Sequence, residues 1–215
     1  MRYEPTFVGL DVHKDTIAVA VADSAPRGEV RFWGHVENTP RQVRKLVDKL
    51  ADSHQSLEFT YEAGPCGYSL YRMISLLGFP CHVVAPSRIP RRSGDRIKND
   101  HRDAVNLARL SRAGELTDVW VPDIVHEAMR DLTRARLAAA KDLKLARQRI
   151  QSLLLRHGRV CPNKSWTRRH RIWLANQTFP HVAQQIAFEG YIQAMEQALA
   201  RKQTIEQQMR AVLDN

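Results

Sequence analysis

Short strand-like runs alternate with helix-like segments over residues 6–84, and this alternation restricts the fold more than any other feature of the sequence. The strand-like runs are rich in β-branched residues, whereas the helical segments repeat apolar residues three and four positions apart. The predicted elements are strands over 6–10, 16–22 and 29–36, a helix over 40–51, a strand over 57–61, a helix over 67–77 and a strand over 81–84.

The order of these elements predicts an α/β fold. Short connections between the first three strands indicate an antiparallel meander, and the two helix–strand units that follow add parallel strands. Three antiparallel strands followed by such units are the topology of the RNase H-like fold, a mixed sheet flanked by helices, which also underlies actin-like ATPases. The helix over 40–51 supplies one covering layer, because its apolar residues share one face: Val43, Leu46, Val47 and Leu50.

The chain after residue 88 is predicted to contain loops and longer helices. Residues 89–98 are polar and basic and include Pro and Gly, which is typical of a loop. Asp100 is predicted to cap a helix that runs to about Ala113. The apolar face of that helix is formed by Ala104, Leu107, Ala108 and Leu110.

Two long helices are predicted over 123–156 and 181–213, separated by a break at 158–164. They suit a long antiparallel helical arm of coiled-coil type, packed as a hairpin or against another chain. We therefore predict a catalytic domain over 1–115 and a helical domain over 116–215. The apolar residues that recur at helical intervals in the first long helix are Leu132, Leu137, Leu143, Leu145, Ile150, Leu153 and Leu154.

Positive charge is concentrated in the middle of the chain. Residues 86–172 hold 21 Lys and Arg against 9 Asp and Glu, whereas the remainder holds 12 against 14. Such a basic stretch indicates a polyanionic partner, with nucleic acid first. No apolar run of about 18 residues and no signal peptide is present, which argues against a membrane protein. Three widely spaced cysteines predict a reduced, cytoplasmic protein.

Four carboxylates lie where the predicted fold brings chain segments together. Asp11 ends the first strand and Glu62 ends the fourth, and these strands are neighbours in the RNase H-like sheet. Asp100 and Asp103 are three residues apart and therefore share one helix face. Taken singly, each carboxylate is also explained as a turn or cap residue. In the predicted fold order we expect all four to converge.

Converging carboxylates repel one another unless a cation or protons neutralise them. Hard oxygen ligands favour Mg²⁺ or Mn²⁺ over zinc. The four residues therefore predict a site for two Mg²⁺ ions, about 3.5–4 Å apart, for phosphoryl transfer. His13 follows Asp11 closely enough to assist the site, although a histidine on a predicted turn is more typical of a surface residue. His101 is expected to point away from the metals, toward solvent or a phosphate.

Three sequence blocks carry a family resemblance: Gly9-Leu10-Asp11-Val12-His13-Lys14, Tyr61-Glu62-Ala63-Gly64-Pro65 with Gly67-Tyr68, and Lys98-Asn99-Asp100-His101-Arg102-Asp103-Ala104. In this order they resemble the DEDD transposases of the IS110 insertion-sequence family. The resemblance implies a RuvC-like domain in which Asp11, Glu62, Asp100 and Asp103 bind Mg²⁺, followed by a coiled-coil region. It also implies a DNA recombinase for transposition that uses a structured guide RNA to choose its DNA.

Members of that family continue into a second domain with a serine nucleophile, and no segment of this chain matches it. The expectation is therefore an N-terminal fragment that retains metal and nucleic-acid binding. A homo-oligomer formed through the helical arm is also expected.

Two basic groups are candidate nucleic-acid contacts. The first precedes the Asp100 helix and consists of Arg88, Arg91, Arg92, Arg96 and Lys98. The second consists of Arg168, Arg169 and Arg171. Phosphate contacts need charge more than precise geometry, so both groups suit backbone binding. The second group lies between Trp166 and Trp173, which suits either stacking on unpaired bases or a helix junction with both rings in the core.

Three functions remain open at this point. The leading one is an Mg²⁺-dependent, nucleic-acid-directed recombinase fragment. A non-catalytic nucleic-acid-binding or dimerising remnant, which competes or assembles with full-length enzyme, is the second, and the long helices favour it. An actin-like ATPase would share the Gly9-Leu10-Asp11 strand, but the second Asp-Gly strand and Gly-rich adenosine motif that it needs are not found.

Overall fold

The computed structural model describes residues 5–25, 27–90 and 99–214. The chain divides into two compact units, Met1–Val121 and Pro122–Asn215. No helix in the described part of the chain combines the length and the hydropathy needed to cross a bilayer.

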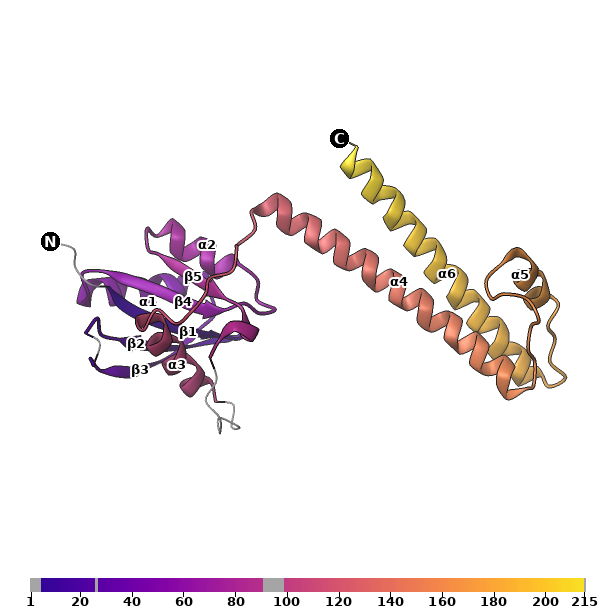
Figure 1. Cartoon of the computed structure of the whole chain (residues 1–215), viewed down its shortest axis with the longest axis horizontal. Coiled ribbons are helices and arrows are strands. Elements are labelled where there is room, and N and C mark those ends of the chain that lie inside the picture. The colour runs from indigo at the N-terminus through magenta and orange to yellow at the C-terminus, as the bar shows by residue number, and fades with distance from the viewer. Residues whose placement is uncertain (1–4, 26, 91–98, 215) are drawn as a thin grey trace. The chain divides into compact units, whose positions relative to one another are not determined.

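The first unit is built on a five-stranded mixed sheet (Figure 1). The strand order is β3-β2-β1-β4-β5, in which β1, β2 and β3 pair antiparallel while β4 pairs parallel with β1 and with β5. This arrangement confirms the predicted RNase H-like, RuvC-like topology. The strands are β1 (Thr6–Val12), β2 (Thr16–Ala22), β3 (Val30–Glu37), β4 (Leu57–Glu62) and β5 (Cys81–Val84).

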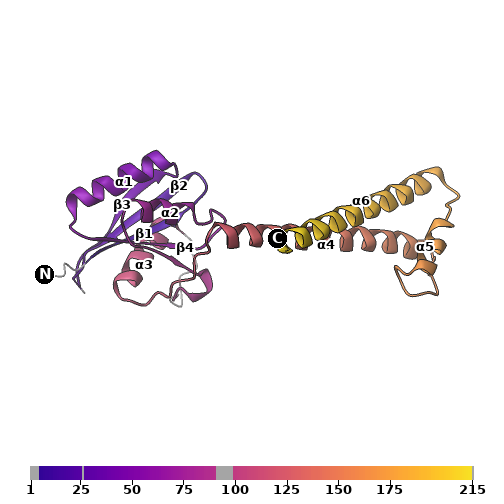
Figure 2. The same cartoon turned by 90° about the horizontal axis from the view of Figure 1, so that it is seen from above.

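Helices cover both faces of this sheet. Figure 2 shows α1 (Pro40–Ser53) and α2 (Ser69–Leu76) on one side and α3 (Asp100–Arg112) on the other. The alternation of side chains along β2 matches these layers. Ile17, Val19 and Val21 join the larger core under α1 and α2, whereas the three alanines at 18, 20 and 22 form a thin layer with α3.

A glycine allows α3 to lie close against β1. A Cβ at Gly9 would collide with the carbonyl oxygen of Ala104 and the amide nitrogen of Ala108. Only hydrogen fits at this position, so the first strand and the helix approach at backbone distance. At the far end of α3, the Ser111 hydroxyl lies 2.9 Å from the Thr60 hydroxyl of β4. These contacts fix the position of α3 relative to the sheet.

The segment after α3 adds an edge contact to the sheet. Val119 N donates to Val83 O at 2.8 Å, and Asp118 forms an isolated antiparallel bridge with Val84. The Asp118 carboxylate lies 2.6 Å from His82 Nδ1. The sequence predicts only a connector here, because a single bridge carries no strand periodicity. The contact covers part of the free edge of β5.

The second unit is a helical hairpin of α4 (Ile124–Arg156) and α6 (Val182–Leu213), which lie side by side and antiparallel (Figures 1 and 2). Two ion pairs cross between the helices, Arg136–Glu206 at 3.0 Å and Arg201–Asp142 at 2.9 Å. The residues of α4 that are buried follow spacings of three and four: Ala139, Leu143, Ala146, Ile150, Leu153 and Leu154.

Two of the leucines that recur at helical intervals along α4 lie outside its buried stripe. Leu137 and Leu145 recur at helical intervals in the sequence, yet they are 56% and 42% exposed. Ala139 and Ala146 occupy the stripe instead, since small residues at a helix–helix contact permit close approach. Recurrence at helical intervals therefore does not place these two leucines in the hairpin core.

A short helix, α5 (Arg168–Ala175), lies in the segment between the long helices and was not predicted. The Thr167 hydroxyl accepts a hydrogen bond from His170 N and so caps α5. Trp166 and Trp173 are partly buried against the hairpin core, and the ring of buried His170 contacts both. These contacts favour the helix junction over the base-stacking interpretation of the two tryptophans.

Candidate metal centre

Asp11 lies near the end of β1, on the sheet face that α3 covers. It is two residues beyond Gly9, and residues i and i+2 of a strand point to the same face. The turn after β1 is held by two hydrogen bonds. His13 N donates to Thr16 O at 2.9 Å, and Asn38 Nδ2 donates to His13 O at 2.8 Å. The position of Asp11 is thus set by the strand, and that of His13 by a braced turn.

The start of α3 brings Asp100 and Asp103 to the same place. The N-cap is Asn99, whose side chain accepts from His101 N at 3.0 Å, and Asp100 is the first helical residue. The prediction that Asp100 caps the helix is therefore wrong by one residue. Because Asn99 satisfies the helix end, the Asp100 carboxylate is available for contacts outside its own helix.

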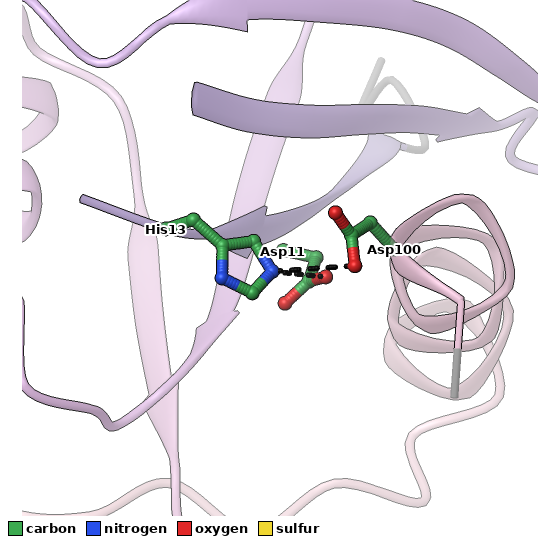
Figure 3. Close-up of side chains that lie close together, drawn as sticks. All are labelled: Asp11, His13 and Asp100. Atoms are coloured by element: carbon green, nitrogen blue, oxygen red, sulfur yellow. Dashed lines mark hydrogen bonds and ion pairs between the residues drawn. The ribbon is translucent and has the colours of Figure 1, made fainter. Parts of the chain in front are cut away.

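His13 joins the first strand to α3. Its Nε2 atom lies 3.2 Å from Asp11 Oδ2 and 3.4 Å from Asp100 Oδ1 (Figure 3). These contacts favour a histidine that assists the site over a simple surface residue. A signal was present in the sequence, since His13 is two residues after Asp11 and so continues the same face of the strand. Ligand atoms of Asp11, His13 and Asp100 all lie within 4.8 Å of one another.

An open cavity of about 780 Å³ connects this cluster with β4. The pairing of Leu10 with Tyr61 in the parallel β1–β4 ladder brings the following residues, Asp11 and Glu62, to the same edge of the sheet. The cavity is lined by Asp11, His13, Glu62 and Asp103, together with residues of the two turns. Asp100 reaches the same cluster through His13. All four carboxylates predicted to converge thus lie at or beside one cavity.

The electrostatics of Asp11 reflect this crowding. Burial raises the pKa of its carboxyl, His13 lowers it, and the nearby Asp103 and Asp100 raise it further, with a net increase. Ionising Asp11 beside other carboxylates is costly. A bound cation would make the ionised form favourable. Asp11, His13 and Asp100 offer two carboxylates and one imidazole within 4.8 Å of one another, a mainly hard-oxygen set that fits a divalent ion such as Mg²⁺ or Mn²⁺.

The other predicted site residues are not among those that line the cavity, or they lie outside the described residues. Arg88 ends a short 3₁₀ helix, η1 (Pro86–Arg88), and is exposed. The His101 ring contacts Phe32 at 4.3 Å between centroids, instead of pointing only to solvent. The candidates on α5 are all exposed: Arg168, Arg169 and Arg171. The candidates that lie outside the described residues are Arg91, Arg92, Arg96 and Lys98.

The chain is similar in sequence to known transposases. Residues 8–158 match the model of the IS110-type DEDD transposase family, described as "Transposase". The chain is 51% identical over 194 residues to "Putative transposase y4qE" of Sinorhizobium fredii, covering 90% of this chain and 50% of that protein. It is 38% identical over 188 residues to the transposase for insertion sequence element IS1533 of Leptospira borgpetersenii, covering 86% of this chain and 54% of that protein.

A solved structure of RuvC from Thermus thermophilus aligns with 53% of this chain and 99% of its own, at a TM-score of 0.37 and 9% identity. The chain spans about half the length of the two transposases that it resembles. The family model, by contrast, covers most of the chain, including every residue of the carboxylate cluster. This chain therefore belongs to the IS110 family of DEDD transposases.

Proposed function

We propose that this chain provides the divalent-metal site of a DNA transposase, which cleaves and transfers phosphodiester bonds of an insertion sequence. The observation that carries the proposal is the convergence of Asp11, Glu62 and Asp103 on one cavity, with Asp100 joined to Asp11 through His13. These groups come from the end of β1 and the turn after it, from the end of β4 and from the start of α3. Packing fixes each of these elements.

The proposed ligands are the carboxylates of Asp11, Glu62, Asp100 and Asp103, and the proposed ions are two Mg²⁺ or Mn²⁺. When bound, such a pair of ions stabilises the attacking and leaving oxygens of an in-line displacement at phosphorus. The contribution of the protein is to hold the carboxylates at short range before any ion or substrate arrives.

Specific residues would do this positioning. The backbone contact at Gly9 keeps α3 against β1, so that Asp100 and Asp103 stay beside Asp11. His13 Nε2 orients the Asp11 and Asp100 carboxylates. Asn38 holds the turn that carries His13. A substrate phosphodiester would enter the open side of the cavity.

The proposed nucleic-acid contacts are Arg88, Arg91, Arg92, Arg96 and Lys98 near the start of α3, and Arg168, Arg169 and Arg171 on α5. Residues 122–215 hold 16 Lys and Arg against 8 Asp and Glu, a net of +8 from Lys, Arg, Asp and Glu. Such an excess favours phosphate backbones, of DNA and of a structured guide RNA.

We also propose that the helical unit forms a homo-oligomer. Leu137 and Leu145 are large apolar residues on α4 that the hairpin core does not cover. A second copy of the hairpin would bury them in an interface of the same chemistry.

The test is a calorimetric titration of Mn²⁺ with and without a structured oligonucleotide, DNA in one arm and RNA in another. Substrate phosphates often complete sites of this kind, which makes the oligonucleotide arm necessary. We expect saturable uptake near two ions per chain, weakened in Asp11→Asn by at least the roughly 10–100-fold that loss of an outer-shell partner costs, because a direct ligand is removed. The matched control is Asp15→Asn, which removes the same charge from an exposed residue on the same turn that does not line the cavity.

Equal metal binding by Asp11→Asn and Asp15→Asn would contradict the proposed site. Oligonucleotide binding that persists without metal uptake would favour the non-catalytic nucleic-acid-binding module. The excess positive charge of the helical unit is the observation that supports that second candidate.

A further inference from the structure

A second cavity lies within the helical unit, with a volume of about 370 Å³. Its polar lining comes from α4, α6 and the turn before α5. Three cations and two amides face it, and no carboxylate lines it. Lys202 is paired with Glu206 at 2.7 Å, which leaves Lys144 and Arg147 as its other positive charges. The residues with polar or aromatic groups in the lining are Lys144, Arg147, Gln148, Gln151, Trp166 and Lys202.

Arg147 is held in an unusual position for a cation. Its guanidinium lies 4.8 Å from the centroid of the Trp166 ring. Its Nε atom is buried and has no hydrogen-bond partner among the described residues. Burial and the neighbouring Arg171 both lower the pKa of Arg147. A half-buried guanidinium without a carboxylate is unfavourable in itself, and an anion in the cavity would neutralise its charge.

The residue under the guanidinium is held in a strained backbone conformation. Trp166 has a φ of 66°, in the left-handed region that bulky residues rarely adopt. Thr167 begins the capping of α5 directly afterwards, and the edge of the Trp166 ring contacts His170. Such strain persists only where the surroundings determine the conformation, and it is common at ligand sites. Because Arg147 and His170 already contact the ring, the ligand is recognised by charge and not by stacking.

The chain around this cavity carries a long excess of positive charge. Residues 141–171 contain ten Lys and Arg and a single acidic residue, Asp142. That carboxylate is already bound to Arg201 at 2.9 Å. A repeated cationic surface is better matched by a polymer of phosphates than by one small anion.

We propose that this cavity binds a backbone phosphate of a nucleic-acid strand, with Arg147 and Lys144 as the contacting cations. The inference rests on the nucleic-acid function proposed above, because it names a binding site for that ligand. It does not use the metal centre, and none of its residues belongs to the first unit.

The test measures binding of the whole chain to a fluorescently labelled oligonucleotide by anisotropy, in EDTA. The arms use single-stranded DNA, its duplex, and RNA of the same sequence, and they separate the possible sources of the phosphate. We expect Arg147→Gln and Lys144→Gln each to weaken binding by roughly tenfold, and each to reduce the salt slope by about one. The matched control is Arg149→Gln, an exposed arginine of the same helix that does not line the cavity. We expect it to cause a much smaller loss.

Equal losses in Arg147→Gln and Arg149→Gln would overturn the proposal, since binding would then follow net charge alone. If Arg147→Gln weakened binding of the chain to an acidic polypeptide and left nucleic-acid binding unchanged, the proposal would be overturned in favour of a protein partner.

Thermal unfolding of Arg147→Met separates a binding role from a structural one. If the cavity is a phosphate site, this variant should unfold at an unchanged or higher temperature while binding weakens as in Arg147→Gln, because the unpaired Nε is removed. A clear drop in unfolding temperature, with binding restored by stabilising osmolyte, would contradict the proposal. If the chain took up no metal but still bound nucleic acid in a way that depends on Arg147, the result would count against the metal centre alone.

Discussion

The two units of this chain gather opposite charges by different means. In the first unit, carboxylates from a strand, a ladder and a helix converge on one cavity, and their positions depend on a tightly packed sheet. The second unit carries a net charge of +8 from Lys, Arg, Asp and Glu, spread over a helical hairpin with a narrow core. Focused negative charge needs precise packing to hold it, whereas distributed positive charge needs only an exposed helix surface.

The largest expected difference between the units is in their tolerance of a single methyl group. Gly9→Ala places a Cβ against the backbone of α3, and we expect it to destabilise the first unit by roughly 4 kcal/mol or more. Gly190→Ala adds the same group to α6, where nothing lies within 4 Å, and should stabilise the second unit by about 1 kcal/mol. Differential scanning calorimetry of both variants checks the comparison. A neutral Gly9→Ala would refute the requirement for backbone contact between β1 and α3.

A smaller effect is expected from two leucines that lie two residues apart on α4. Leu143 is 4% exposed and belongs to the hairpin core, so Leu143→Ala should cost about 2–5 kcal/mol. Leu145 is 42% exposed, and Leu145→Ala should change the stability of the monomer by less than about 0.5 kcal/mol. Denaturant unfolding at low protein concentration measures both. Equal losses would mean that Leu145 is buried, either in the hairpin or against a second copy.

The smallest expected effect is the pH dependence of Asp11 in metal-free protein. Its pKa is raised in the folded state, so the native protein binds the proton more tightly than the unfolded chain does. The contribution of Asp11 to stability therefore decreases as pH rises from below 3.8 through the raised pKa. Asp11→Asn should then raise the free energy of unfolding by roughly 1 kcal/mol at neutral pH and by little below pH 3.8.

Asp15→Asn is the control for this measurement, since it alters an exposed carboxylate outside the cavity. Unfolding curves of the three proteins in EDTA across this pH range decide the matter. A gain from Asp11→Asn that is equal at both ends of the range would exclude ionisation of Asp11 as its cause.

Much of the fold was predictable because local periodicity and turn chemistry agree with the tertiary structure. The strands β2 and β5 match their predicted bounds, and α1, α3, α4 and α6 differ by one or two residues at an end. The four residues predicted for the inner face of α1 are all buried. Strong patterns of this kind arise because a strand or helix that packs on one side must repeat its apolar residues at the period of its own backbone.

The parts that were predicted poorly depend on partners that lie far away in sequence. Leu137 and Leu145 fit a helical pattern, but α6 contacts a different stripe of α4. In the sequence, Trp166 and Trp173 suit base stacking as well as they suit a helix junction. Their contacts with the hairpin core favour the junction. A periodic pattern states which residues share a face and leaves open which face another element covers.

The sequence by itself determined the types and order of the elements and the RNase H-like topology, and it named four carboxylates as candidates for the site. The tertiary structure decided that His13 lies between Asp11 and Asp100, and that Arg147 is buried beside a strained Trp166. The reason is physical: secondary structure follows from interactions within a few residues, whereas these contacts need α3 docked on β1 and the turn before α5 folded against α4.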